Sequence, residues 1–168
     1  LEDGSSLVDE TKNQYIGSQL IKSVSPHWSL GAGFTSGQST FNNIERGNRL
    51  ALATEYNVFP YSLSAEKSLT FGYYVGINQF QYDQLTVLGL DEETRGNHGA
   101  FADFDFDQPW GNLSVGIYSA VMLDDPSIYR VTLDAYLRYR IARGLSVRLW
   151  GESALVKDQI YLANSSAS

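Results

Sequence analysis

The amino-acid sequence predicts an all-β protein, an antiparallel up-and-down transmembrane β-barrel with about eight strands in this chain and more in the intact protein. Three observations lead there: apolar and polar side chains alternate, aromatic residues gather beside the turns, and connections alternate in length. In Tyr129–Ile141 every odd position is apolar or aromatic, and the even positions carry three arginines and an aspartate. Successive side chains on a strand point to opposite faces, so this strand has one apolar and one charged face. Crossing a bilayer takes about 9–11 residues, and this alternation is longer.

Composition suits both a β-sandwich and an outer-membrane barrel. Charged residues make up 18% of the chain, against about 25% in soluble domains, and aromatic residues 13%. Mean hydropathy is −0.23, which does not argue against a barrel, because only alternate residues of its strands face lipid. A net charge of −7 disfavours a nucleic-acid partner, and the absence of cysteine excludes disulfides. We expect outer-membrane lipid as the main partner and the bacterial outer membrane as the location.

The alternation repeats through a single domain, residues 1–168, and no segment of helical period competes with it. The expected strands are Asn13–Val24, Trp28–Thr35, Arg49–Phe59, Leu69–Tyr82, His98–Gln108, Asn112–Leu123, Tyr129–Ile141 and Leu145–Leu155. Glycine recurs on the polar face of several of them, where it relieves crowding in a narrow or sharply coiled barrel.

The connections between these strands alternate in expected length, as in outer-membrane barrels, which have short turns at one end and long loops at the other. The short ones are 23–27, 60–68, 108–111 and 142–144, and the longer ones are 36–48, 84–97 and 124–127. Aromatic residues flank each short turn and predict an interfacial girdle, formed by Trp28, Phe59, Tyr61, Trp110 and Tyr139. A second girdle at the other end is expected from Phe34, Phe80, Tyr82, Tyr129 and Tyr161.

Several short motifs resemble a family of largely uncharacterised, porin-like bacterial outer-membrane β-barrel proteins. The motifs are Glu55–Ser62 (EYNVFPYS), Leu69–Phe71 (LTF), Gln108–Gly111 (QPWG), Arg143–Ser146 (RGLS) and Lys157–Leu162 (KDQIYL). They cover most of the chain in the family's order, but Ala142 replaces the bulky aromatic residue usual in that family. The resemblance implies that this chain is the middle or major part of a larger barrel. It implies fold and location and carries no established activity.

The polar face holds the candidate functional residues. They are Arg49, Glu55, Asp103, Asp105, Asp107, Arg130, Asp134, Arg138, Arg140, Arg148 and Glu152. In a closed barrel these side chains face the lumen. Two alternatives remain open: they form a charged pore or ligand site, or they pair across strands and fill a narrow interior that conducts nothing.

No metal, other cofactor or catalysis is expected. The carboxylates Asp103, Asp105 and Asp107 stand about 6.6 Å apart along a strand, too far to share one ion at about 2.4 Å. His27 and His98 stand at no recognisable spacing from a nucleophile and read as structural histidines.

The expected function is an outer-membrane channel or a membrane-anchored subunit of a surface assembly, with other outer-membrane proteins or lipoproteins as candidate partners. The alternative is a soluble up-and-down β-barrel that binds an apolar small ligand, with its apolar face inside. A barrel-wall enzyme acting on lipid is a third reading, which lacks a visible catalytic pair.

Overall fold

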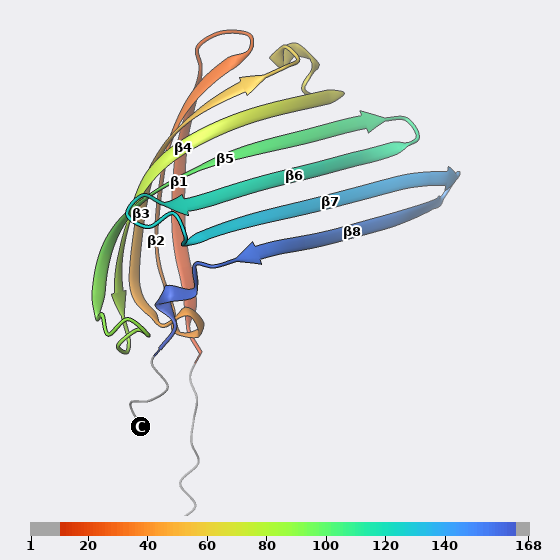
Figure 1. The fold of residues 1–168 in the computed structure, drawn as a ribbon. Helices are drawn as coiled ribbons and strands as arrows, with labels where there is room; N and C mark the ends of the chain where they lie inside the picture. The colour runs from red at the N-terminus through yellow and green to blue at the C-terminus, as the bar shows by residue number, and fades with distance from the viewer. Residues whose placement is uncertain (1–10, 164–168) are drawn as a thin grey trace, which may run out of the picture.

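A computed structural model describes residues 11–163 and contains one antiparallel sheet of eight strands, each paired with its neighbours in chain order (Figure 1). The all-β, up-and-down prediction is therefore confirmed. The strands are β1 (Asn13–Ser23), β2 (Trp28–Ser39), β3 (Ile44–Asn57), β4 (Lys67–Tyr82), β5 (Glu92–Gln108), β6 (Gly111–Met122), β7 (Tyr129–Ala142) and β8 (Leu145–Val156). Three 3₁₀ turns accompany them, η1 (Thr40–Asn42), η2 (Tyr61–Leu63) and η3 (Gln159–Tyr161). Within residues 11–163 no helix has the length and apolar character needed to span a membrane.

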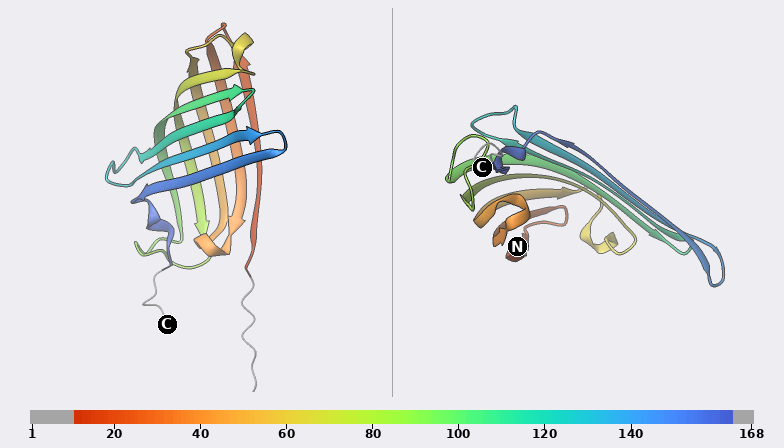
Figure 2. Two further views of the ribbon diagram at one scale, coloured as in Figure 1. Left: turned by 90° about the vertical axis from the view of Figure 1, so that its right-hand side faces the viewer. Right: turned by 90° about the horizontal axis from the view of Figure 1, so that it is seen from below.

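The sheet is open in the described part of the chain. β1 and β8 are its edges, because among residues 11–163 each pairs with a single neighbouring strand and not with the other edge. Figure 2 shows the sheet as one curved layer, with β6–β8 tilted strongly across β1–β4. This tilt is the right-handed strand twist accumulated over eight strands. A closed barrel with additional strands stays a prediction.

Three strands extend further than their alternation predicts. β2 continues to Ser39, β3 begins at Ile44 and β5 begins at Glu92, so that polar residues join the ladder beyond the last apolar positions. The connections become 24–27, 58–66, 109–110 and 143–144 at one end, here called the turn end. At the opposite loop end they are 40–43, 83–91 and 123–128. Because 58–66 contains η2 and 40–43 is short, the expected alternation of connection lengths is wrong for β2–β3 and β3–β4.

The structure is a single layer with almost no hydrophobic interior. Tyr82 is the only buried hydrophobic residue among those described, and large apolar side chains lie exposed on one face of the sheet, such as Leu52 (59%), Ile77 (50%) and Leu149 (59%). Neighbouring strands pair so that apolar positions stay in register, as where Leu52 pairs with both Ala32 and Val75. A sheet normally buries its apolar face against another layer. None of residues 11–163 supplies such a layer.

Candidate functional site: the concave face

The charged residues predicted for the polar face do share one face of the sheet. Directly paired residues in an antiparallel ladder lie on the same side of the sheet, and the chain of pairs Asp103–Gly116, Gly116–Asp134 and Asp134–Glu152 carries one side across four strands. The same side takes in Arg49, Glu55, Asp103, Asp105, Asp107, Arg130, Asp134, Arg138, Arg140, Arg148 and Glu152.

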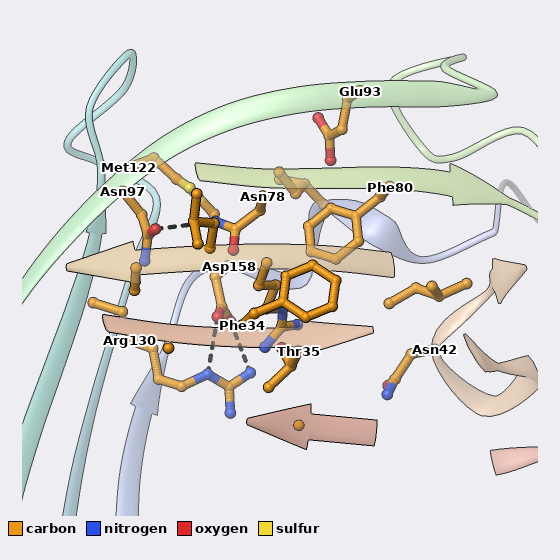
Figure 3. Close-up of a pocket in the computed structure, with 18 of the residues that line it drawn as sticks. Phe34, Thr35, Asn42, Asn78, Phe80, Glu93, Asn97, Met122, Arg130 and Asp158 are labelled. Carbon is orange, nitrogen blue, oxygen red and sulfur yellow. Dashed lines mark hydrogen bonds and ion pairs between the residues drawn. The ribbon is translucent and has the colours of Figure 1, made fainter. Parts of the chain in front are cut away.

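This polar face is the concave side of the curved sheet. A cavity of about 1100 Å³ lies against it and is lined from edge to edge, by Gly17 of β1, Arg49 of β3, Asn78 of β4, Arg130 of β7 and Val156 of β8 (Figure 3). Residues of both outermost strands can line one hollow only on the inside of the curve. We call this the concave face and the apolar side the convex face. A soluble barrel that binds an apolar ligand needs the opposite arrangement.

Acidic side chains form one row across the concave face. Asp103 of β5, Asp134 of β7 and Glu152 of β8 occupy the same register, with Gly116 of β6 between the first two. Tyr118 donates a hydrogen bond from its hydroxyl to Asp103. We call Asp103, Asp134 and Glu152 the acidic row.

A basic row lies four residues along the strands toward the turn end. Arg138 pairs directly with Arg148, and Arg140 follows Arg138 by one step on the same face. At about 3.3 Å per residue the two rows are about 13 Å apart. Like charges thus oppose like charges in both rows, which destabilises an antiparallel pair. Opposite charges do not stand directly opposite each other between β7 and β8, because the register aligns equal signs.

The ion pairs within residues 11–163 lie at the loop end instead. Arg95 contacts the carboxylates of Glu93 at 2.6 Å and Asp124 at 2.8 Å. Arg130 binds Asp158, a residue after β8, at 2.9 Å. Asp107 stands in line with Arg138 across Asn112 of β6, so the basic row is partly balanced, and the remaining charges of the concave face require water or ions.

A hydrogen-bonded track continues from the acidic row into the first strands. Asn57 donates to Glu55 at 2.9 Å, Ser29 donates to Glu55 at 3.4 Å, and Thr70 donates to Asn57. Thr70 is the register partner of Asp103, so the track meets the acidic row. Ser29, Asn57 and Thr70 are buried, and sequence reasoning missed them. The signal was available, because alternation places each of the three on the polar face of its own strand.

Aromatic rings lie directly over glycines on the concave face. A Cβ at Gly72 would stand 2.0 Å from the Phe101 ring, and one at Gly99 would stand 2.6 Å from the Tyr74 ring. At Gly99 the carbonyl oxygen of Ser119 would also lie only 1.8 Å away. Glycine therefore lets tall side chains lie along the wall instead of standing out from it. The expected crowding holds at Gly72, Gly76 and Gly116, whereas Gly31 and Gly33 have ordinary contacts.

The turn-end aromatics divide into two groups. The first group is exposed and consists of Trp28, Trp110 and Tyr139. Trp28 and Tyr139 lie on the convex face. The Trp110 ring packs against Tyr139, with ring centroids 5.9 Å apart. Phe59 is half-buried beneath the Lys67 ammonium at 4.5 Å. The Tyr61 hydroxyl is buried without a hydrogen-bond partner, which does not suit a ring at a water interface.

The loop-end girdle is wrong in two of its members. Phe80 and Tyr82 lie on the concave face, where the Arg49 guanidinium stands 5.3 Å from the Phe80 ring and Tyr82 bonds Glu93. Phe34 and Tyr129 lie on the convex face as expected. The side chain of Tyr161 is outside the described part of the structure.

Both histidines are hydrogen-bonded. His27 donates from Nδ1 to the carbonyl oxygen of Asn57 at 2.7 Å and stacks on Tyr56. His98 shares a 2.9 Å hydrogen bond with the Tyr73 hydroxyl on the convex face. Among residues 11–163 no three His, Cys, Asp or Glu side chains are grouped to hold a metal ion.

No family model, curated protein or solved structure matches this chain.

Proposed function

We propose that this chain forms the wall of a bacterial outer-membrane β-barrel channel, with its convex face against lipid and its concave face against water. The observation that carries the proposal is the uncovered convex face, exposed over eight strands of a sheet that has almost no hydrophobic interior. Lipid is the covering layer that suits a surface which is apolar on every strand and follows the curve of the sheet.

Strand length supports the same proposal. The strands run from 11 residues in β1 to 17 in β5, and about 9–11 tilted residues cross a bilayer. The polar extensions of β2, β3 and β5 at the loop end then stand in water beyond the hydrocarbon. The exposed Trp28, Trp110 and Tyr139 occupy the opposite boundary, where amphipathic rings are favoured.

The concave face supports a channel rather than a packed interior. Its acidic and basic rows align like charges, and such rows are stable only where water or mobile ions screen them. The close approach of the Phe101 and Tyr74 rings to Gly72 and Gly99 keeps these two side chains against the wall. A membrane-anchored subunit with a blocked lumen is the remaining form of the proposal.

The membrane part is tested with two neighbouring positions on β8, Leu149 on the convex face and Trp150 on the concave face, both exposed. Leu149→Arg is expected to cost about 2–4 kcal/mol in a bilayer and to block insertion into lipid vesicles. Trp150→Arg is expected to insert as the wild type does. Equal behaviour of the two variants contradicts a lipid-facing convex side.

The channel part is tested by planar-bilayer conductance of the full-length protein refolded in detergent. Steady conductance is expected, with an ion selectivity that shifts in opposite directions in Arg138→Ala and Asp105→Ala. Insertion without conductance contradicts the channel and leaves the anchored subunit.

A further inference from the structure

The chain after β8 turns across the loop end of the concave face. Residues 157–163, here called the latch segment, contain η3 and reach the β4–β5 connection, although the segment begins beside β7 (Figures 1 and 2). In sheet order β5 and β6 separate these two attachment points. The latch segment therefore acts as a chord across part of the curved sheet.

The first attachment of the latch segment is to β7. The Lys157 amide donates to the Tyr129 carbonyl oxygen at 2.8 Å and extends the β7–β8 ladder by one bond. The Arg130 guanidinium then donates from two nitrogens to the two carboxylate oxygens of Asp158, each at 2.9 Å (Figure 3). A bidentate pair of this kind fixes direction as well as distance, so it orients the start of the latch segment.

The second attachment is to the β4–β5 connection. The Val87 amide donates to the Leu162 carbonyl oxygen at 2.8 Å, and Thr86 and Ala163 form an antiparallel bridge. Thr86 is 1% exposed, and its hydroxyl accepts a bond from the Leu90 amide. The latch segment thus ends on a well-ordered turn.

That turn is itself fastened to the β2–β3 connection. The Asn43 side chain donates to the Gln84 carbonyl oxygen at 2.8 Å and accepts from the Gln84 amide at 2.9 Å. The loop-end rim is therefore joined by direct contacts from β2–β3, through β4–β5 and the latch segment, to β7.

From this geometry we propose that the latch segment is a closing strap that narrows the loop-end mouth of the channel, and that breaking the Arg130–Asp158 attachment widens the mouth. Asp158, Gln159 and Ile160 form part of the wall of the large concave cavity, so moving them removes that wall (Figure 3). The Arg130 side chain is 40% exposed, which suits a strap that opens. That the strap narrows a channel rests on the proposed function. The position of the strap and its release are independent of it.

The position of the latch segment is tested by a cysteine pair, because the chain has no cysteine of its own. Thr86→Cys combined with Ala163→Cys places thiols on antiparallel partners, whose Cα atoms stand about 4.5–5.5 Å apart, within the disulfide range of about 4.4–6.8 Å. Mild oxidation of the refolded full-length protein is expected to join them within one chain. A pair that stays reduced under conditions that oxidise a control dithiol overturns the proposal.

The release of the strap is tested by labelling a thiol inside the cavity. Met122→Cys supplies a single thiol on a residue that lines the same cavity as Asp158. In this background Asp158→Asn is expected to speed labelling by a bulky polyethylene-glycol maleimide about threefold to fivefold, the shift expected when a partly exposed ion pair is lost. Arg130→Gln is expected to act likewise, and a small maleimide is expected to label all variants at one rate.

The matched control is Asp91→Asn, the same chemical change at an exposed carboxylate of the β4–β5 connection. Equal labelling of the Asp158→Asn and Asp91→Asn proteins overturns the strap. Labelling needs no current, so the two proposals fail separately. If Asp158→Asn speeds labelling but the inserted protein never conducts, the strap is supported and the channel is contradicted. If the protein conducts but labelling is unchanged, the channel is supported and the strap is contradicted.

Discussion

The first and second halves of the concave face differ in almost every property of their side chains. Across β1–β4 the face is mostly small and uncharged, and Gly31, Gly33, Ala51 and Ala53 line a hollow of about 310 Å³. Across β5–β8 it carries the acidic and basic rows. One continuous sheet thus presents a smooth wall and a charged wall.

This difference gives the two halves different sensitivities to substitution. In the small-residue half, backbones and aromatic rings lie close, so its geometry is sensitive to a single added carbon. At the outer strand of the charged half the side chains stand in open space, as Glu152 and Arg148 do on β8, so the geometry of β8 tolerates substitution while its electrostatics does not. Steric changes should therefore act more strongly on the first half than on β8, and charge changes should act mainly on the second half.

The largest expected effect is steric and compares glycines from the two halves. In Gly37→Ala on β2 the new Cβ meets the Gln14 carbonyl oxygen at 2.4 Å and the Tyr15 Cβ at 2.8 Å, so the β1–β2 ladder must shift. We expect a loss of about 3 kcal/mol or a failure to refold, measured by urea unfolding in detergent. Gly151→Ala on β8 meets nothing within 4 Å and should change stability by less than about 0.5 kcal/mol. Equal effects would remove the steric contrast between the halves.

The next effect is electrostatic and belongs to the charged half. Asp134→Asn should lower the preference of the channel for cations, because it removes the central carboxylate of the acidic row. The reversal potential across a potassium chloride gradient reports the change. The control is Asp91→Asn, at an exposed loop carboxylate, which should leave the reversal potential unchanged. A shift of the same size at Asp91 would mean that charge outside the acidic row sets selectivity.

A smaller effect distinguishes like-charge rows from a salt-bridged interior. Arg148→Gln relieves repulsion with its direct partner Arg138 and should raise stability by about 0.2–1 kcal/mol. The measurement is the urea midpoint of the refolded protein at low salt, where exposed charges are least screened. A lowered midpoint would indicate that Arg148 forms a favourable pair after all.

The smallest effect lies outside both halves, in the β6–β7 connection. The Ser127 hydroxyl and amide donate to Asp125 at 2.7 and 3.0 Å and, with the more distant Arg95, hold the pKa of this exposed carboxyl below its ordinary value. Ser127→Ala should raise that pKa toward the ordinary value, as an NMR titration would show. A lowered folded-state pKa favours folding above the unfolded pKa, and this contribution disappears as the pH falls through the folded value. An unchanged Asp125 titration would mean that the amide of residue 127 and Arg95 set the shift instead.

Alternation in the sequence predicted the strands and their faces because period-two patterning and strand geometry are the same property. The charged residues from Arg49 to Glu152 share a face as expected. Phe80 and Tyr82 also follow strict alternation, which places them on the polar face. Assigning them to a girdle disregarded that rule in favour of their position near a strand end.

Register could not be predicted in the same way. Sliding one strand by two residues keeps every side chain on its face and exchanges all its cross-strand partners, so alternation alone does not decide whether Arg138 meets Arg148 or Glu152. The polar ends of β2, β3 and β5 show no alternation to extend. The latch segment follows the last alternating residues, and its attachment depends on Thr86, which is distant in sequence.

The near absence of a hydrophobic interior has a consequence for how this protein acquires its structure. Only Tyr82 among the described hydrophobic residues is withdrawn from solvent by the sheet itself, so burial of side chains by other side chains supplies little of the driving force for folding. The free energy that orders the strands must come from whatever covers the convex face. Folding of the sheet and covering of its convex face are then one event. The stability of the protein is a property of the sheet together with the layer that covers it. In a bilayer, that stability would vary with acyl-chain length even though no residue of the protein had changed.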